Sequence, residues 1–172
     1  NATMLFGHLE TERERLEHLA ALRELQDRTG GFVCFIPLPF QPGNTEISHL
    51  PPTTGVEELR TIAVSRLMLD NIRHIKAYWV MLTVKLAQAA LYYGADDFDG
   101  TVIEEKIGHR AGGASELGRT RRAIEGISRD AVFASVERDS LFNRKNDGAR
   151  TVELFCGDAV TDCEIIDGGR CR

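Results

Sequence analysis

Long hydrophobic runs are missing from this sequence of 172 residues. No apolar segment approaches the roughly 18 residues that a membrane-spanning helix needs, and the first residues lack the basic and then apolar layout of a signal peptide. These two absences predict a soluble, cytoplasmic protein without a membrane partner.

An excess of positive charge is also missing, because 21 Lys and Arg residues face 26 Asp and Glu residues, for a formal net charge of -5. Nucleic-acid-binding domains typically carry a strongly basic patch, so this balance argues against a nucleic-acid partner. The one basic cluster, at Arg119, Arg121 and Arg122, is most simply a solvated helix face. A Ser/His/Asp arrangement, a Walker loop and a metal-spaced pair of histidines are absent, so these common catalytic patterns find no support.

Cysteine is scarce, with four residues in the chain. Cys34 lies within an apolar strand pattern and is predicted to be a small buried core residue. Cys156, Cys163 and Cys171 are separated by six and seven residues in a Gly/Asp-rich tail, which matches none of the usual zinc or redox spacings. A loose tail is the favoured interpretation, a metal site formed by these three is the alternative, and we predict no metal ligand.

The segment from Ile75 to Ile107 organises the rest of the chain. Ile75 to Val80 is β-branched and aromatic, Leu86 to Tyr93 is rich in Ala and Leu, and Gly94 stands where a helix C-cap glycine belongs. A helix that is apolar on nearly every face must be buried. Because parallel strands cannot be joined by a tight turn, we predict a strand, a buried crossover helix and a second, parallel strand.

The same plan repeats along the chain. Capping boxes at Thr11 and Glu14 and at Thr54 and Glu57 each start a helix. Strands are predicted at residues 1–6, 32–37, 75–80 and 96–103, and helices at 11–29, 54–69, 86–93 and 119–129. The buried face of the second helix is predicted at Val56, Leu59, Ile62, Ala63, Leu67 and Met68. We therefore predict an α/β fold of parallel strands with outer helices over residues 1–142, followed by a tail at 143–172 that forms a marginal hairpin or stays disordered.

Ligands of parallel α/β sheets and (β/α)8 barrels bind at the carboxyl ends of the strands, so the residues after each predicted strand are candidates for a binding site. They are expected to converge on one rim. The candidates are Gly7, His8, Glu10, Pro37, Phe40, Gln41, Asn44, Trp79, Met81, Lys85, Asp96, Asp97, Asp99, Thr101, Glu104 and Glu105.

Each candidate also has a structural alternative. His8 is either functional or a local hydrogen-bonding group, and Tyr78 and Trp79 alternate on a strand, with core packing favoured for Tyr78. Lys85 would lie in the first turn of a helix, where a cation is unfavourable, so it either binds an anionic ligand or is simply exposed. The acidic residues after position 95 are ligand-binding groups, turn formers or a charged helix start.

A family resemblance rests on residues Thr3, Leu5, Gly7 and Glu10, which fit a G-x-I-x-G-x-x-E pattern with Thr in place of the first Gly. In radical S-adenosylmethionine (SAM) enzymes this pattern lies on the fifth barrel strand, beside the adenosyl group. The blocks NATMLFGHLET, LRELQDRTGGF, FIPLPFQPGNT, LRTIAVSRLMLDNI, HIKAYWVML, GADDFDGTVIEEKI and VERDSLF occur in the order typical of aminofutalosine synthase. Over residues 1–142 the chain resembles that family, which implies the C-terminal half of a radical SAM TIM-like barrel, strands five to eight.

The resemblance implies a radical enzyme of menaquinone biosynthesis by the futalosine pathway. Such an enzyme joins the 5′-deoxyadenosyl group of SAM to 3-[(1-carboxyvinyl)oxy]benzoate, with a 4Fe-4S cluster as its second cofactor. The adenosyl pocket would then include Thr3, Leu5, Gly7 and Glu10. The residues expected at the substrate are His8, Lys85, Asp99 and Glu104 as catalytic groups and Gln41, Asn44, Trp79 and Thr101 as binding groups. His8 or Lys85 would meet a carboxylate, Trp79 the aromatic ring, and the acidic residues ribose hydroxyls.

The cluster-binding C-x-x-x-C-x-x-C motif of this family is not in the sequence, and the chain begins without methionine. We therefore expect a continuation of something longer, with the cluster-binding N-terminal half of the barrel as a partner and no SAM cleavage by this chain alone. Two alternatives stay open. The first is a sibling radical SAM enzyme, either cyclic dehypoxanthinyl futalosine synthase or a deazaflavin-cofactor synthase; the second is a non-catalytic half-barrel that serves as a binding module.

Overall fold

A computed structural model describes residues 1–100 and 120–145 of the chain. The predicted site residues Thr101 and Glu104, the end of the fourth predicted strand and most of the tail with its three cysteines lie outside these residues. Within the described part, no helix combines the length and apolar character that a membrane span requires.

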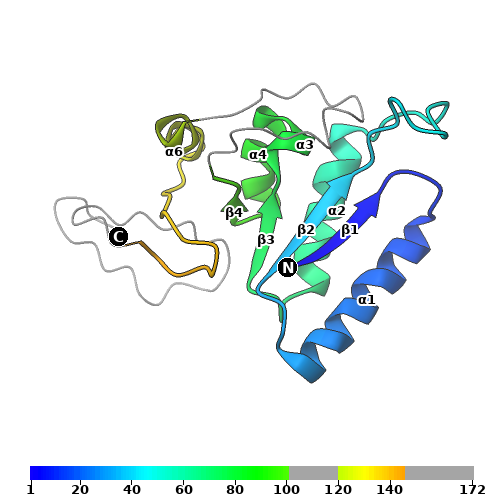
Figure 1. Ribbon diagram of the computed structural model, residues 1–172, viewed down its shortest axis with the longest axis horizontal. Helices are drawn as coiled ribbons and strands as arrows, with labels where there is room; N and C mark the ends of the chain where they lie inside the picture. The colour runs from blue at the N-terminus through cyan, green and yellow to red at the C-terminus, as the bar shows by residue number, and fades with distance from the viewer. Residues whose placement is uncertain (101–119, 146–172) are drawn as a thin grey trace.

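Four parallel strands form one sheet in the order β1-β2-β3-β4, which is also their order in the sequence (Figure 1). The strands are β1 (Ala2–Phe6), β2 (Cys34–Pro39), β3 (His74–Ala77) and β4 (Asp97–Phe98). Each β-to-β connection passes through helix, as parallel neighbours require. The predicted α/β class is confirmed, and this arrangement is consistent with half of a TIM-like barrel.

The two faces of the sheet differ in chemistry. In β1 the side chains alternate, so that Ala2, Met4 and Phe6 are buried while Thr3 and Leu5 are exposed. Residues paired across parallel strands point to the same side, which extends both rows across the sheet. The face toward the helices carries Ala2, Met4, Phe6, Phe35, Pro37, Pro39, Ile75, Ala77 and Phe98, and the opposite face, here called the open face, carries Thr3, Leu5, Cys34, Ile36, Leu38, His74, Lys76 and Asp97.

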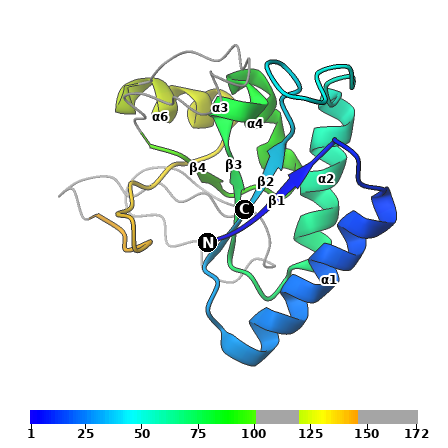
Figure 2. The same ribbon diagram turned by 45° about the vertical axis from the view of Figure 1, so that its right-hand side comes forward.

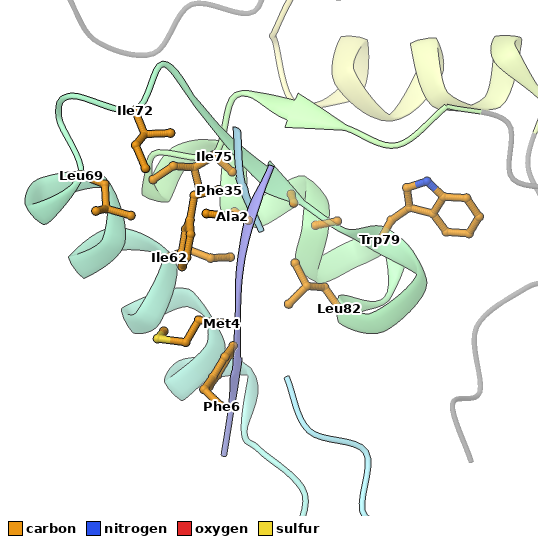
Figure 3. Packing of buried hydrophobic residues seen from close by; sticks show 14 of the residues in the cluster. Ala2, Met4, Phe6, Phe35, Ile62, Leu69, Ile72, Ile75, Trp79 and Leu82 are labelled. Carbon is orange, nitrogen blue, oxygen red and sulfur yellow. The ribbon is translucent and has the colours of Figure 1, made fainter. Parts of the chain in front are cut away.

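The hydrophobic core fills the space between the first face and the helices (Figure 3). Phe35 on the second strand is fully buried between the first and third strands, and Ile62 and Leu69 reach it from the helix layer. Burial of Cys34 is confirmed as well. The core therefore fixes which row of each strand is left for the open face.

Helix α1 (Glu12–Thr29) confirms the predicted capping box. The Thr11 side chain accepts a hydrogen bond from the Glu14 amide, and the Glu14 carboxylate accepts one from the Thr11 amide at 2.7 Å. At the other end Gly30 adopts φ 59°, the left-handed conformation of a C-cap. Local side-chain chemistry thus sets both ends of this helix.

The prediction for helix α2 (Gly55–Met68) was right about its start and partly right about its buried face. Thr54 accepts a hydrogen bond from the Glu57 amide, but the Glu57 carboxylate pairs with Arg15, so half of the predicted capping box is formed. Val56 and Leu67 are 76% and 79% exposed. Ile62 is buried as predicted, and Leu59 and Met68 pack against the core. The other buried residues of this helix are polar: Glu58, Thr61 and Ser65. Ser65 can be buried because its hydroxyl donates to the Thr61 carbonyl at 2.7 Å.

The region after β3 also differs from the prediction. The strand ends at Ala77, and Trp79–Leu82 forms the short helix α3, so the inference that Trp79 alternates with Tyr78 along a strand was wrong. Helix α4 (Val84–Ala90) and the 3₁₀ turn η1 (Leu91–Tyr93) follow. Tyr92 and Tyr93 are 63% and 46% exposed, so this crossover is buried on part of its surface only. The predicted cap at Gly94 is confirmed by its φ of 98°.

The last described helix, α6 (Arg121–Asp130), packs beside α4 (Figures 1 and 2). Two hydrogen bonds join them, from Gln88 to the Ile127 carbonyl at 2.8 Å and from Tyr92 to the Ala131 carbonyl at 2.6 Å. The chain then continues past β4, where residues 137–145, here called the C-terminal strap, make their contacts with β3 and β4.

Candidate functional site at the open face of the sheet

A tight turn follows β1 and is closed by Glu10. Its carboxylate accepts hydrogen bonds from the backbone amides of Gly7 at 2.5 Å and His8 at 2.9 Å. The guanidinium of Arg15 donates to it at 2.6 Å and also to Glu57 on α2 at 2.7 Å. Glu10 therefore holds the turn in place through both oxygens and ties it to two helices.

Partial burial raises the pKa of the Glu10 carboxyl, but the hydrogen bonds from Gly7, His8 and Arg15 outweigh this effect. The pKa of Glu10 consequently lies below its ordinary value of 4.5. Glu10 is thus an ionised structural group near neutral pH.

Replacing Glu10 by glutamine is expected to remove a pH-dependent stabilisation of about 1–2 kcal/mol at pH 7, because hydrogen bonds to a charged group are lost. A lowered pKa stabilises the fold fully above the unfolded value of 4.5, and that contribution fades as the pH falls through the folded pKa. The stability gap between the wild type and Glu10→Gln should therefore close on acidification. Chemical denaturation from pH 7 to pH 3 measures this gap; a gap that stays constant would contradict the assignment.

The control is Glu17→Gln, since Glu17 pairs with Arg13 at an exposed helix position. That substitution should change stability by less than about 0.5 kcal/mol.

Position 7 requires glycine for two reasons, its backbone conformation and its close contact with Thr53. Its φ is 87°, in the left-handed region, and a Cβ built on it would lie 2.0 Å from Cγ2 of Thr53. Gly7→Ala should therefore cost about 1–3 kcal/mol in the free energy of unfolding. Gly30→Ala is the matched control, because Gly30 also has a positive φ, 59°, with no atom near the added Cβ. Equal losses in the two variants would show that the contact with Thr53 has no effect.

The rim at the carboxyl ends of β1 and β2 carries several predicted residues. The ring of His8 lies edge-on to Phe40, with 5.7 Å between ring centroids. Gln41 donates to the Met81 carbonyl at 3.5 Å, which joins the loop after β2 to α3. Asn44, in the same loop, is exposed and has φ 56°. These residues follow neighbouring strands, as predicted.

Trp79 and Asp99 lie together at the ends of β3 and β4. The indole Nε1 donates to the Asp99 carbonyl at 3.2 Å, and Trp79 is only 1% exposed. The Asp99 side chain is about one quarter exposed and receives the Lys76 ammonium at 2.5 Å. Lys85 is exposed in the first turn of α4. Trp79 is therefore packed in the core, while Asp99 and Lys85 are reachable by a ligand.

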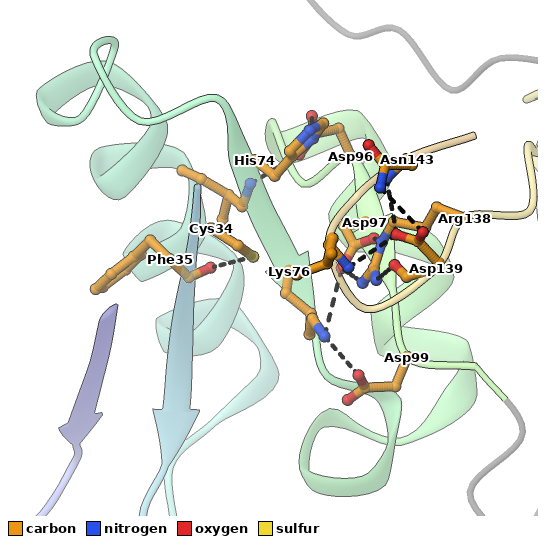
Figure 4. A network of polar contacts seen from close by, with 12 residues as sticks. Cys34, Phe35, His74, Lys76, Asp96, Asp97, Asp99, Arg138, Asp139 and Asn143 are labelled. Atoms are coloured by element: carbon orange, nitrogen blue, oxygen red, sulfur yellow. Dashed lines mark hydrogen bonds and ion pairs between the residues drawn. The ribbon is translucent and has the colours of Figure 1, made fainter. Parts of the chain in front are cut away.

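A charged cluster that the sequence did not identify lies on the open face (Figure 4). Lys76 and Asp97 are paired residues of β3 and β4, only 5% and 8% exposed. Arg138 of the C-terminal strap binds Asp97 through Nε at 2.6 Å and Nη2 at 2.7 Å, and this pairing raises the Arg138 pKa. For Lys76 the sequence did carry a signal, because a lysine between Ile75 and Ala77 is unusual within an apolar strand. Arg138 carried none, since it lies 41 residues from its partner Asp97.

A second polar network holds the amino-terminal ends of the same strands. Asp96 accepts from Arg66 at 3.0 Å and from the Ile75 amide at 2.7 Å, and its other oxygen lies 2.9 Å from Nδ1 of His74. The His74 ring stacks on Phe142 of the strap, with 4.9 Å between centroids. Asp96 is thus a structural group rather than a rim residue.

The described residues do not fit an iron–sulfur cluster. They include one cysteine, Cys34, and burial raises the pKa of its thiol to about 12, which disfavours the thiolate that ligates iron. Across residues 1–100 and 120–145, His, Cys, Asp and Glu form no group of three suited to a metal ion. An adenosyl ligand suits the open face better, because Thr3 and Leu5 expose a small polar and an apolar side chain beside the Gly7 turn.

Comparisons with known proteins show the family of this chain. Residues 29–150 fit the family model described as the CofH/MqnC C-terminal region. The chain belongs to this family. It is 53% identical over 146 residues to the aminodeoxyfutalosine synthase of Thermus thermophilus, a match that covers 83% of the chain and 39% of that relative. The predicted family resemblance is therefore confirmed.

Two other relatives carry different names. A 5-amino-6-(D-ribitylamino)uracil--L-tyrosine 4-hydroxyphenyl transferase of Methanococcoides burtonii is 39% identical over 148 residues, covering 82% of the chain and 42% of the relative. The cyclic dehypoxanthine futalosine synthase of Streptomyces coelicolor is 44% identical over 111 residues, or 64% of the chain and 28% of the relative. The chain spans about two fifths of the length of the first relatives it matches.

Proposed function

We propose that this chain forms the C-terminal half of the barrel of a radical SAM enzyme of the aminodeoxyfutalosine synthase type. The reaction adds the 5′-deoxyadenosyl group to 3-[(1-carboxyvinyl)oxy]benzoate and yields aminofutalosine for menaquinone biosynthesis. The observation that supports this choice is the 53% identity to the Thermus thermophilus enzyme, against 38–47% for the relatives with other names.

The open face of the sheet is the surface that such an enzyme needs. Four parallel strands with helices on one side leave the other side for the barrel interior, where a second set of strands would close the sheet edges at β1 and β4. The partner we propose is the cluster-binding N-terminal half. The described residues of this chain would contribute the wall that faces the ligands.

On this wall, Thr3 and Leu5 would contact the adenosyl group from the edge strand. Gly7 lets the chain turn closely over the ligand, and Glu10 holds that turn through its two amide contacts. The 4Fe-4S cluster would be held by the proposed N-terminal half, and together with SAM it would supply the adenosyl radical. The chain's own part is to orient the two reactants and keep water away from them.

The other end of the rim would bind the substrate. His8 or Lys85 is suited to a carboxylate, and Gln41, Asn44 and Asp99 offer groups for hydrogen bonding. Thr101 and Glu104 keep the roles predicted from the sequence. Trp79 would shape the site from beneath, since its ring is buried in the core and its indole holds the Asp99 backbone.

Reconstitution tests the proposal directly. The chain is produced together with a cluster-binding N-terminal half, the cluster is rebuilt without oxygen, and the protein is incubated with SAM, a reductant and 3-[(1-carboxyvinyl)oxy]benzoate. Mass spectrometry should detect aminofutalosine. A well-folded, cluster-loaded protein that releases only 5′-deoxyadenosine contradicts the proposed substrate. Turnover of the substrates of the sibling enzymes would support them, and failure to bind any adenosyl ligand would support a non-catalytic module.

A further inference from the structure

A chain of three ion pairs links the C-terminal strap to the rim, in the order Arg138–Asp97, Asp97–Lys76 and Lys76–Asp99. Arg138 makes two short bonds to Asp97, at 2.6 and 2.7 Å, one to each carboxylate oxygen. Lys76 lies 3.4 Å from Asp97 but 2.5 Å from Asp99. The lysine is therefore directed to Asp99, while Asp97 is occupied by the arginine.

The arginine is fixed in turn by the strap. Its guanidinium carbon lies 3.8 Å from the centroid of the Phe142 ring, which stacks on His74 at the start of β3. The same guanidinium donates to the Asp139 carbonyl at 2.9 Å. Arg138 is thus held against the open face from both sides, and its position does not depend on Asp97 alone.

Charge balance explains why both cations are needed. Lys76 and Asp97 have side chains only 7% and 9% exposed, so neither charge is well hydrated and each needs a partner within the protein. With Arg138 in place, each carboxylate has its own cation: Arg138 pairs with Asp97 and Lys76 pairs with Asp99. Without it, the buried Asp97 carboxylate would draw Lys76 away from the more exposed Asp99.

We infer that Lys76 is a positioning residue for Asp99, and that Arg138 keeps it in this role by occupying Asp97. Asp99 then presents an oriented carboxylate at the carboxyl end of the sheet, and because its side chain is 24% exposed it is suited to accept from the hydroxyls of a ribose diol. The identity of the ligand rests on the proposed function. The diol is that of the adenosyl ribose, which SAM carries before the reaction and the nucleoside product carries after it.

Binding measurements test the inference apart from turnover. Calorimetry on the complete barrel compares S-adenosylhomocysteine, its 2′,3′-dideoxy analogue and aminofutalosine. Lys76→Met keeps the Arg138–Asp97 pair and should raise the Kd of the diol-containing ligand about tenfold, the scale of one hydrogen bond to a charged group. The dideoxy analogue should bind the variant and the wild type equally. A loss of affinity for S-adenosylhomocysteine alone, for aminofutalosine alone or for both shows whether Asp99 meets the diol before the reaction, after it or throughout.

A second pair of variants separates positioning from simple structural support. Arg138→Gln alone should weaken diol binding as much as Lys76→Met, because Lys76 moves to Asp97. Adding Asp97→Asn should restore binding to within about threefold of the wild type, since Lys76 again has Asp99 as its only acidic partner in the cluster. A double variant that stays as weak as Arg138→Gln, or equal loss for the dideoxy ligand, overturns the inference.

The two proposals fail in different ways. If aminofutalosine forms and Lys76→Met binds all three ligands normally, the inference is wrong and the proposed function stands. If the wild type binds no nucleoside at all, both are wrong.

Discussion

Replacing Leu5 by tryptophan is expected to weaken the binding of S-adenosylhomocysteine by about a hundredfold, or roughly 2.7 kcal/mol. Leu5 is 48% exposed on the open face of the edge strand, so the larger ring points away from the core that the described residues form. It would instead fill the space proposed for the adenosyl group. Calorimetry on the complete barrel measures the loss, and circular dichroism checks that the fold is retained.

Leu67→Trp is the matched control for this variant. Leu67 is 79% exposed on α2, whose other side packs on the sheet, so the same substitution there lies away from the open face. Its affinity for S-adenosylhomocysteine should equal that of the wild type. An unchanged affinity in the Leu5 variant would remove the adenosyl group from this part of β1.

Truncating Trp79 to alanine is expected to lower the free energy of unfolding by about 3–5 kcal/mol. The side chain is 1% exposed, and its removal leaves a cavity beside α3 as well as an unpaired Asp99 carbonyl. Trp79→Phe keeps most of the volume and loses the hydrogen bond, so it should cost only about 1–2 kcal/mol. Chemical denaturation at 25 °C measures both values.

Tyr93→Ala, at a position that is 46% exposed, is the control and should cost less than either Trp79 variant. If Trp79 served the substrate rather than the core, Trp79→Ala would weaken substrate binding and leave the unfolding free energy almost unchanged. The measurement therefore separates the predicted ring contact with substrate from the packing role that the structure gives this residue.

Local patterns were sufficient for most of the elements and for many of their ends. The capping box at Thr11, the glycine caps at Gly30 and Gly94, and the apolar run around Phe35 each depend on residues close in sequence. The same kind of reasoning failed for part of α2, where Val56 and Leu67 face outward and Glu58 and Ser65 face inward. Glu58 and Ser65 can be buried because they form hydrogen bonds with Thr53 and with the Thr61 carbonyl. The spacing of apolar residues along the sequence does not reveal these hydrogen bonds.

The sequence by itself determined an α/β chain of parallel strands, the family to which it belongs, and a rim that includes the turn at Gly7 and Glu10. Only the tertiary structure showed that Trp79 is buried and that Lys76, Asp97 and Arg138 form one cluster on the open face. The physical reason is separation along the chain. Caps and strand patterns are set by neighbours within a few residues, whereas Arg138 meets Asp97 across 41 residues, after the strap has passed the edge of the sheet.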